Sequence, residues 1–139
     1  MIPRRRFILI SASAAIAEAA ATPADVAASI RTLTGGAPLI DGVVRLDLPV
    51  MVENGNSVAL TVSAADPPSP IQSIHVFTEG NPLPRAVSFH FGLRTGMPRV
   101  STRIRLATSQ TVIAIARSQD GRYWRDSVEL LVTLAACIE

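Results

Sequence analysis

A change of sequence period at Gly42 constrains the fold of this chain more than any other feature. Beyond it, apolar and polar residues alternate in short runs, and clusters of Gly, Pro, Asn and Asp separate the runs. In the clearest run, GVVRLDLP, the apolar Val44 and Leu46 flank the charged Arg45. Because successive side chains of a β-strand point to opposite faces, this pattern predicts strands with one buried face.

About seven such runs follow one another, and no helical pattern lies between them. They span residues 42–49, 57–64, 71–80, 86–92, 99–107, 110–118 and 122–136. Their number and spacing predict an all-β fold, an immunoglobulin-like antiparallel β-sandwich over residues 42–134. The paired cysteines of antibody domains are missing, so burial of apolar side chains must stabilise the sandwich. The residues expected in its core are Val44, Leu46, Val58, Leu60, Val62, Ile74, Val76, Val112, Ile113, Ile115, Val128, Leu130 and Val132.

A short helix and a lead-in are expected before the sandwich, within residues 22–41. Thr22 is a suitable N-cap, and Pro23 fits the first turn of a helix. The pair Gly35-Gly36 then ends the helical pattern.

Residues 1–21 have the layout of a cleavable export signal. Arginines at positions 4 to 6 are followed by an apolar run from Phe7 to about Ala17 and then by Ala-x-Ala triplets. The apolar run is shorter than the roughly 20 residues that a membrane-spanning helix needs. The order of Arg4, Arg5 and Phe7 favours the twin-arginine variant of the signal, with an ordinary Sec signal as the alternative. We therefore expect a mature protein in the periplasm, without a membrane span.

The charge of the mature chain argues against some classes of partner. The sequence has 13 Lys+Arg and 11 Asp+Glu residues, and the leader contains three of the basic and one of the acidic residues. The remainder carries equal numbers of either sign, so we expect no general attraction to nucleic acid or anionic lipid. All basic residues are arginines, which excludes Schiff-base catalysis by a lysine.

No pattern of catalytic or metal-binding residues is found in the sequence. A Gly-x-Ser-x-Gly elbow, a P-loop and a dinucleotide-binding fingerprint are all missing. The two histidines, His75 and His90, lie in predicted strands, and we interpret them as structural or exposed polar residues. Asp120, Asp126 and Glu129 are interpreted as turn and solvent-exposed residues. We predict a protein that is not an enzyme and holds neither a metal nor another cofactor.

Three features are candidates for contact with a partner protein, each with a structural alternative. Arg103 and Arg105 fall on one face of a strand, which is either a solvated face or a partner-binding patch. Phe89 and Phe91 also share a face, as a core stripe or as an interface stripe. Trp124 follows a turn, where it either plugs the end of the sandwich or anchors a partner.

The only cysteine, Cys137, lies in the last segment of the sequence, VTLAACIE. A lone cysteine cannot form an internal disulfide, so it is an intermolecular partner, a reactive group or a packing residue. An exposed unpaired thiol in an oxidising compartment tends to form disulfides.

Three segments together resemble SoxY, the sulfur-carrier subunit of the periplasmic thiosulfate-oxidising (Sox) system. They are VENGNSVALTV, IHVFTEGNPLPRAVSFHF and VSTRIRLATSQTVIAIARSQDGRYWRDSVELLVTLAAC. The twin-arginine start agrees with this resemblance, which covers nearly the whole mature chain. It implies an immunoglobulin-like carrier that pairs with a second sandwich subunit, SoxZ, and has no catalytic site of its own.

The resemblance also implies a role for the thiol. SoxY-like proteins end in a Gly-Gly-Cys-Gly-Gly arm, and a c-type cytochrome joins the arm cysteine oxidatively to thiosulfate. The adduct is then presented to a hydrolase that releases sulfate and, in some systems, to a sulfane dehydrogenase. Cys137 matches the carrier cysteine by position. The four flanking glycines of the family are replaced by Ala135, Ala136, Ile138 and Glu139.

These replacements predict a changed arm over residues 135–139. Glycine opens backbone conformations that other residues do not adopt, so Ala135 and Ala136 should make the arm stiffer. Ile138 requires a wider channel than glycine. The charge of Glu139 beside the terminal carboxylate should raise the pKa of the Cys137 thiol. The alternative is a SoxY-like structural or interaction module without carrier activity, in which the cysteine serves packing or an intersubunit disulfide.

Overall fold

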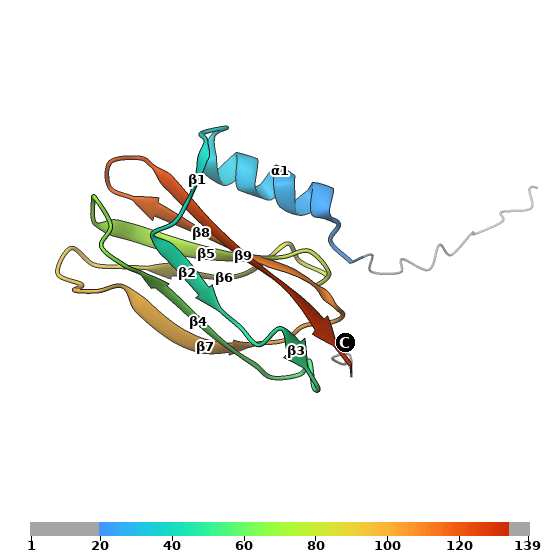
Figure 1. Cartoon of the computed structure of the whole chain (residues 1–139). Helices are drawn as coiled ribbons and strands as arrows, with labels where there is room; N and C mark the ends of the chain where they lie inside the picture. The colour runs from blue at the N-terminus through green and yellow to red at the C-terminus, as the bar shows by residue number, and fades with distance from the viewer. Residues whose placement is uncertain (1–19, 134–139) are drawn as a thin grey trace, which may run out of the picture.

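The computed structural model describes residues 20–133, which form a sandwich of two β-sheets with one helix on its outside (Figure 1). One sheet has the order β1-β9-β8-β5-β6, with β3 also paired to β9, and the other has the order β2-β4-β7. The elements are α1 (Pro23–Thr34), β1 (Leu39–Asp41), β2 (Val44–Asp47), β3 (Met51–Val52), β4 (Val58–Ala64), β5 (Ile71–Thr78), β6 (Arg85–His90), β7 (Arg99–Ile104), β8 (Gln110–Ser118) and β9 (Tyr123–Val132). The predicted fold class is thus confirmed.

The described residues form nine strands rather than about seven, because the sequence pattern missed β1 and β3. These two strands have three and two residues, too few to show an alternation of period two. Both pair in parallel with β9, whereas the other ladders are antiparallel. The predicted start of the sandwich at residue 42 is therefore too late, since β1 already belongs to the larger sheet.

Helix α1 begins and ends where the sequence predicts. The Thr22 hydroxyl accepts a hydrogen bond from the Asp25 backbone N–H, and the Asp25 carboxylate accepts one from the Thr22 N–H. These bonds form a capping box, and they hold the pKa of Asp25 below its usual value. Gly35 ends the helix with a φ of 64°, in the left-handed region that favours glycine.

The apolar interior consists of two clusters, one on each face of the larger sheet. The main cluster lies between the sheets and contains most of the predicted core residues. On the opposite face, Val26 and Ile30 of α1 cover Phe77, Ile115 and Tyr123. Ile115 is buried as predicted, but it belongs to a second cluster that the helix covers, rather than to the cluster between the sheets.

Asp126 connects the two sheets near the middle of β9. Its side chain is half-buried, and its Oδ2 accepts a hydrogen bond of 2.7 Å from the backbone N–H of Leu46 in β2. The interpretation of Asp126 as a solvent-exposed residue is therefore wrong. A charged acceptor on the inward-facing side of β9 thus satisfies an N–H at the edge of the smaller sheet.

The antiparallel ladders give the sandwich two distinct ends (Figure 1). We call the end at the β8–β9 turn, residues 118–122, the turn end. The opposite end, where β9 finishes beside β3, is called the arm end because the predicted arm follows it. In the described part of the chain, no helix is long and apolar enough to cross a membrane.

Candidate functional site

The predicted functional group, Cys137, lies outside the described residues, as do Ala135, Ala136, Ile138 and Glu139. The structure describes the chain up to Thr133, four residues before the thiol. Residues 130–133 are the last described residues before the predicted arm, and we call them the arm root.

Strand β3 holds one side of the arm root. It pairs in parallel with β9, so that Met51 is opposite Leu131 and Val52 is opposite Val132. The N–H of Leu131 donates to the carbonyl of Val50, and the N–H of Thr133 donates to the carbonyl of Val52, both at 2.9 Å. The backbone at the root thus has hydrogen-bond partners up to the last described residue.

Ser109 holds the other side of the arm root. Its hydroxyl accepts a hydrogen bond of 2.8 Å from the N–H of Val132. β9 is therefore anchored on both edges at the point where the chain continues towards Cys137.

A network around Asn81 and Gln110 ties together the loops at the arm end. The Gln110 side chain accepts from the N–H of Gly80 and donates to the Asn81 side chain. The Asn81 side chain also bonds the backbone of Arg105 and Ala107. A Cβ at Gly80 would lie 2.8 Å from Thr108 Cγ2, so the network requires glycine there. Sequence reasoning missed this network, and the Gly-Asn-Pro run of the loop was its only signal.

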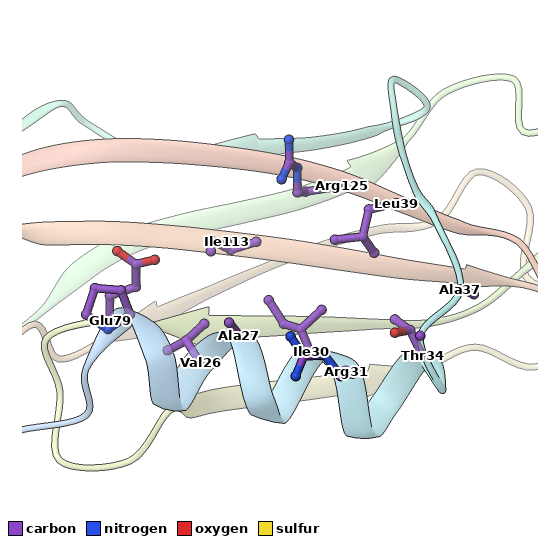
Figure 2. A pocket seen from close by; sticks show the side chains of 12 residues that line it. Val26, Ala27, Ile30, Arg31, Thr34, Ala37, Leu39, Glu79, Ile113 and Arg125 are labelled. Carbon is purple, nitrogen blue, oxygen red and sulfur yellow. The ribbon is translucent and has the colours of Figure 1, made fainter.

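Among the hollows on the described surface we consider two, and neither of these is lined by a cysteine or by a histidine. The first, of about 330 Å³, lies between α1 and the strands of the larger sheet (Figure 2). Its walls are apolar at Val26 and Ile30, and charged at Arg31, Glu79 and Arg125. The second, of about 370 Å³, lies beside the arm root and is lined by Leu130 and Leu131 among others.

His75 is buried on the outer face of the larger sheet, between two hydroxyl groups. Its Nδ1 lies 2.7 Å from Ser88 Oγ, and its Nε2 lies 3.0 Å from Ser73 Oγ. Burial, and after it the charges of Arg85, His90 and Arg117, together lower the pKa of His75 to about 4. The ring is therefore neutral at neutral pH and has partners for both nitrogens, which confirms the structural interpretation of this histidine.

No group of three or more metal-ligating side chains converges within residues 20–133. His75 and His90 do lie close together, with ring centroids 5.8 Å apart in an edge-to-face arrangement. The two rings alone do not provide the three or four ligands of a typical metal site.

The other sequence candidates divide into core and surface. Phe89 and Phe91 are half-buried and pack against the main core cluster, which favours the core alternative. Trp124 is only 7% exposed and belongs to the same cluster, so its ring fills the sandwich rather than anchoring a partner. Arg103 and Arg105 are exposed on the outer face of the smaller sheet. Their contact with a partner stays a prediction.

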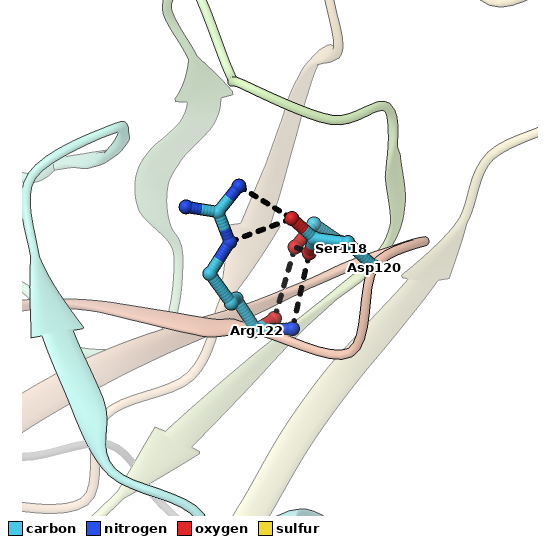
Figure 3. Close-up of polar contacts among 3 residues, drawn as sticks. All are labelled: Ser118, Asp120 and Arg122. Atoms are coloured by element: carbon cyan, nitrogen blue, oxygen red, sulfur yellow. Dashed lines mark hydrogen bonds and ion pairs between the residues drawn. The ribbon is translucent and has the colours of Figure 1, made fainter.

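The turn end is closed by a polar cluster of three residues (Figure 3). Asp120 accepts hydrogen bonds from the hydroxyl of Ser118 and from the side chain and backbone N–H of Arg122, with which it also forms an ion pair. The bond from Arg122 is the main reason why the pKa of Asp120 is lowered to about 2, with Ser118 second. Asp120 is therefore a turn residue, as the sequence predicts.

Comparison with known families decides what kind of protein this sandwich is. The family model for sulfur oxidation protein SoxY matches residues 30–137, more than three quarters of the chain. The chain belongs to the SoxY family. The matched range includes the last residues of the helix, both sheets, the arm root and position 137. Sequence comparison with curated proteins gives no match.

Solved structures agree with this family. The sulfur carrier protein SoxY from Chlorobium limicola f thiosulfatophilum is 27% identical and superposes with a TM-score of 0.68, over 80% of this chain and 98% of that one. Superoxide reductase (neelaredoxin) from Ignicoccus hospitalis is 18% identical with a TM-score of 0.57, over 81% and 94% of the two chains. At that identity the second match shows only a shared fold.

Proposed function

We propose that this SoxY-family protein is a carrier that holds thiosulfate-derived sulfur covalently on Cys137. The observation that carries the proposal is the family match, which extends to residue 137 and so includes the only cysteine of the chain. The anchored arm root supports it, because β9 leads directly to the thiol from a fixed base. The carrier itself has no catalytic role, and separate enzymes act on the thiol.

The proposed chemistry has a loading and an unloading step. In loading, Sγ of Cys137 forms a sulfur–sulfur bond with the outer sulfur of thiosulfate. The thiol proton goes to solvent, and a c-type cytochrome partner accepts the two electrons in one-electron steps. In unloading, a hydrolase adds water to the terminal sulfonate sulfur and releases sulfate with one proton, which leaves a persulfide on Cys137. A sulfane dehydrogenase is a further partner for that persulfide.

A SoxZ-like subunit is the proposed stable partner, and the outer face of the smaller sheet is the proposed contact. That face is polar, and its exposed arginines include Arg45, Arg99 and Arg103. None of the three forms an ion pair within the described residues. The proposed location is the periplasm, reached through a signal that contains Arg4 and Arg5 and is then removed.

Intact mass spectrometry tests the carrier proposal directly. The mature protein, purified together with a SoxZ-like subunit, is incubated with thiosulfate and the cytochrome. We expect one adduct per chain in the parent protein and none in the Cys137→Ser variant. An equal adduct on the variant, or no adduct on either, would overturn carrier activity.

Alkylation of the native protein separates the carrier from the alternative module. A carrier thiol reacts with iodoacetamide at about the rate of a free thiol, because it must be reachable. Protection of the thiol until the protein is denatured would support a purely structural cysteine.

A further inference from the structure

Three large apolar side chains are exposed together at the arm root. Val50 is 69% exposed, Met51 is 63% exposed and Leu131 is 58% exposed. Leu131 is the β9 partner of Met51 and donates its N–H to the carbonyl of Val50, so the three residues are backbone neighbours at the place where β3 meets β9. Figure 1 shows β3 beside the end of β9. We call these three residues the root patch. Scattered apolar side chains need no explanation, whereas adjoining ones at a defined place on the surface indicate contact with a partner.

The distance along the chain from the root patch to the thiol sets how close a partner must come. Cys137 follows Thr133 by four residues, which span at most ~14 Å when extended. An enzyme that takes the thiol into a cleft of about that depth therefore brings the mouth of its cleft against residues 130–133. The root patch lies at this point, and it is covered whenever the thiol is fully inserted.

The second hollow, beside Leu131, adds a charge requirement. Glu79 and Glu129 are among its lining residues, and no basic side chain lines it. A partner that covers Leu131 also covers this hollow and leaves its carboxylates without water unless it supplies a positive group.

We infer that the root patch, Val50, Met51 and Leu131, is the docking surface for the enzyme that loads Cys137. The rim of that enzyme's cleft is apolar where it contacts the root patch. A lysine or arginine beside this apolar part of the rim reaches the hollow at Glu129. This inference rests on the proposed carrier function and adds to it where the body of the carrier is recognised. The short alanine-containing arm makes the contact necessary, since it leaves little length between the root and the thiol.

The test compares a root-patch variant with a matched variant at the turn end. The first is Met51→Ser/Leu131→Ser. The control is Leu93→Ser/Met97→Ser, which removes two side chains that are 87% and 71% exposed. Both lie in the β6–β7 loop at the turn end, whose backbone is hydrogen-bonded to β5 and to β4. Adduct formation by the cytochrome partner with thiosulfate is followed by mass spectrometry at several carrier concentrations. Alkylation by iodoacetamide is measured in parallel.

We expect the root-patch variant to lose about tenfold in kcat/KM for the carrier, mainly through KM, as removal of central interface residues does. Its alkylation rate should equal that of the parent, because the arm and its thiol are unchanged. The control should load at the parent rate. Glu129→Gln should load more slowly at low salt and show a weaker salt dependence, since screening acts on exposed charge pairs.

Other outcomes overturn the inference. Loading of the root-patch variant at the parent rate, or an equal loss in the control, would show that the patch is not used. Loss of the SoxZ-like subunit from the root-patch variant, with loading per complex unchanged, would assign the patch to the subunit interface instead. An absence of adduct on the parent protein contradicts the carrier function itself, which distinguishes that failure from failure of the docking surface. Circular dichroism and thermal unfolding check that each variant is folded.

Discussion

The turn end and the arm end of the sandwich differ in how their side chains are packed. At the turn end, Asp120 is fully engaged by Ser118 and Arg122, and the ring of Trp124 is buried directly behind them. At the arm end, the backbone is hydrogen-bonded on both edges, yet Met51 and Leu131 point apolar side chains into solvent. Near its start, β9 therefore contains the buried Trp124, whereas near its end it contains the exposed Leu131.

We therefore expect substitutions of buried residues at the turn end to change stability, and substitutions in the root patch to change partner binding. Burial of a large side chain stabilises a fold, so the turn end should dominate the free energy of unfolding. An exposed apolar side chain stabilises little, so Met51 and Leu131 at the arm end should be replaceable without loss of the fold, unlike the buried Leu130 beside them. Substitutions at the two ends should therefore change different measurements.

The largest effect is expected from Trp124→Ala at the turn end. Removal of a buried aromatic side chain leaves a cavity and should lower the free energy of unfolding by about 3–5 kcal/mol. Leu131→Ala at the arm end should change it by less than about 0.5 kcal/mol, since the side chain is 58% exposed. Urea unfolding of the two variants checks the comparison, and similar losses at both ends would break it.

A second effect, dependent on pH, is expected near the turn end at His75. Its pKa in the folded state is about 4, below the ordinary value of 6.5, so the folded state favours the neutral ring. The stability that this provides is complete above pH 6.5 and is lost as the pH falls from 6.5 to about 4. His75→Gln cannot take up the proton and should lose less stability than the parent over this range. Urea midpoints at pH 7.0 and 4.5 test this, and equal losses in both proteins would contradict it.

The smallest effect is expected from Ser109→Ala at the arm end. The variant loses the hydrogen bond from the N–H of Val132, which should cost about 0.5–1.5 kcal/mol. Exchange of the amide hydrogens of Val132 and Thr133 should become faster, because local opening of the root becomes easier. Hydrogen exchange followed by NMR measures this, with amides of the β8–β9 turn as the internal reference. Unchanged exchange at the root would mean that β3 alone holds it.

The sequence was informative about the fold wherever a strand is long and half-buried. The alternation in β2 and β4 predicts both their existence and their inward face, and Thr22 and Gly35 mark the ends of α1. The short strands β1 and β3 were missed because their pairing depends on β9, which lies far away in the sequence. The second core was missed for a similar reason, since burial of Ile115 requires a helix from the other end of the chain.

For the candidate site, the sequence located the chemical group but not its setting. A single cysteine is visible in any sequence, and its position agreed with a known carrier. The root patch could not be predicted, because Val50 and Met51 read as an apolar run that belongs inside. Only the parallel register of β3 on β9 shows that these side chains lie on the surface beside Leu131.

The parallel clamp of β3 on β9 also has a mechanical consequence. A force applied along the axis of β9 at its C-terminal end acts at right angles to its hydrogen bonds with β3 and β8. Such a load shears several bonds at once, whereas a load across the sheet would open them one after another. The ladder to β8 extends over most of the strand, so the force spreads through the sheet. The described end of β9 therefore resists being pulled away from the sandwich along its own axis.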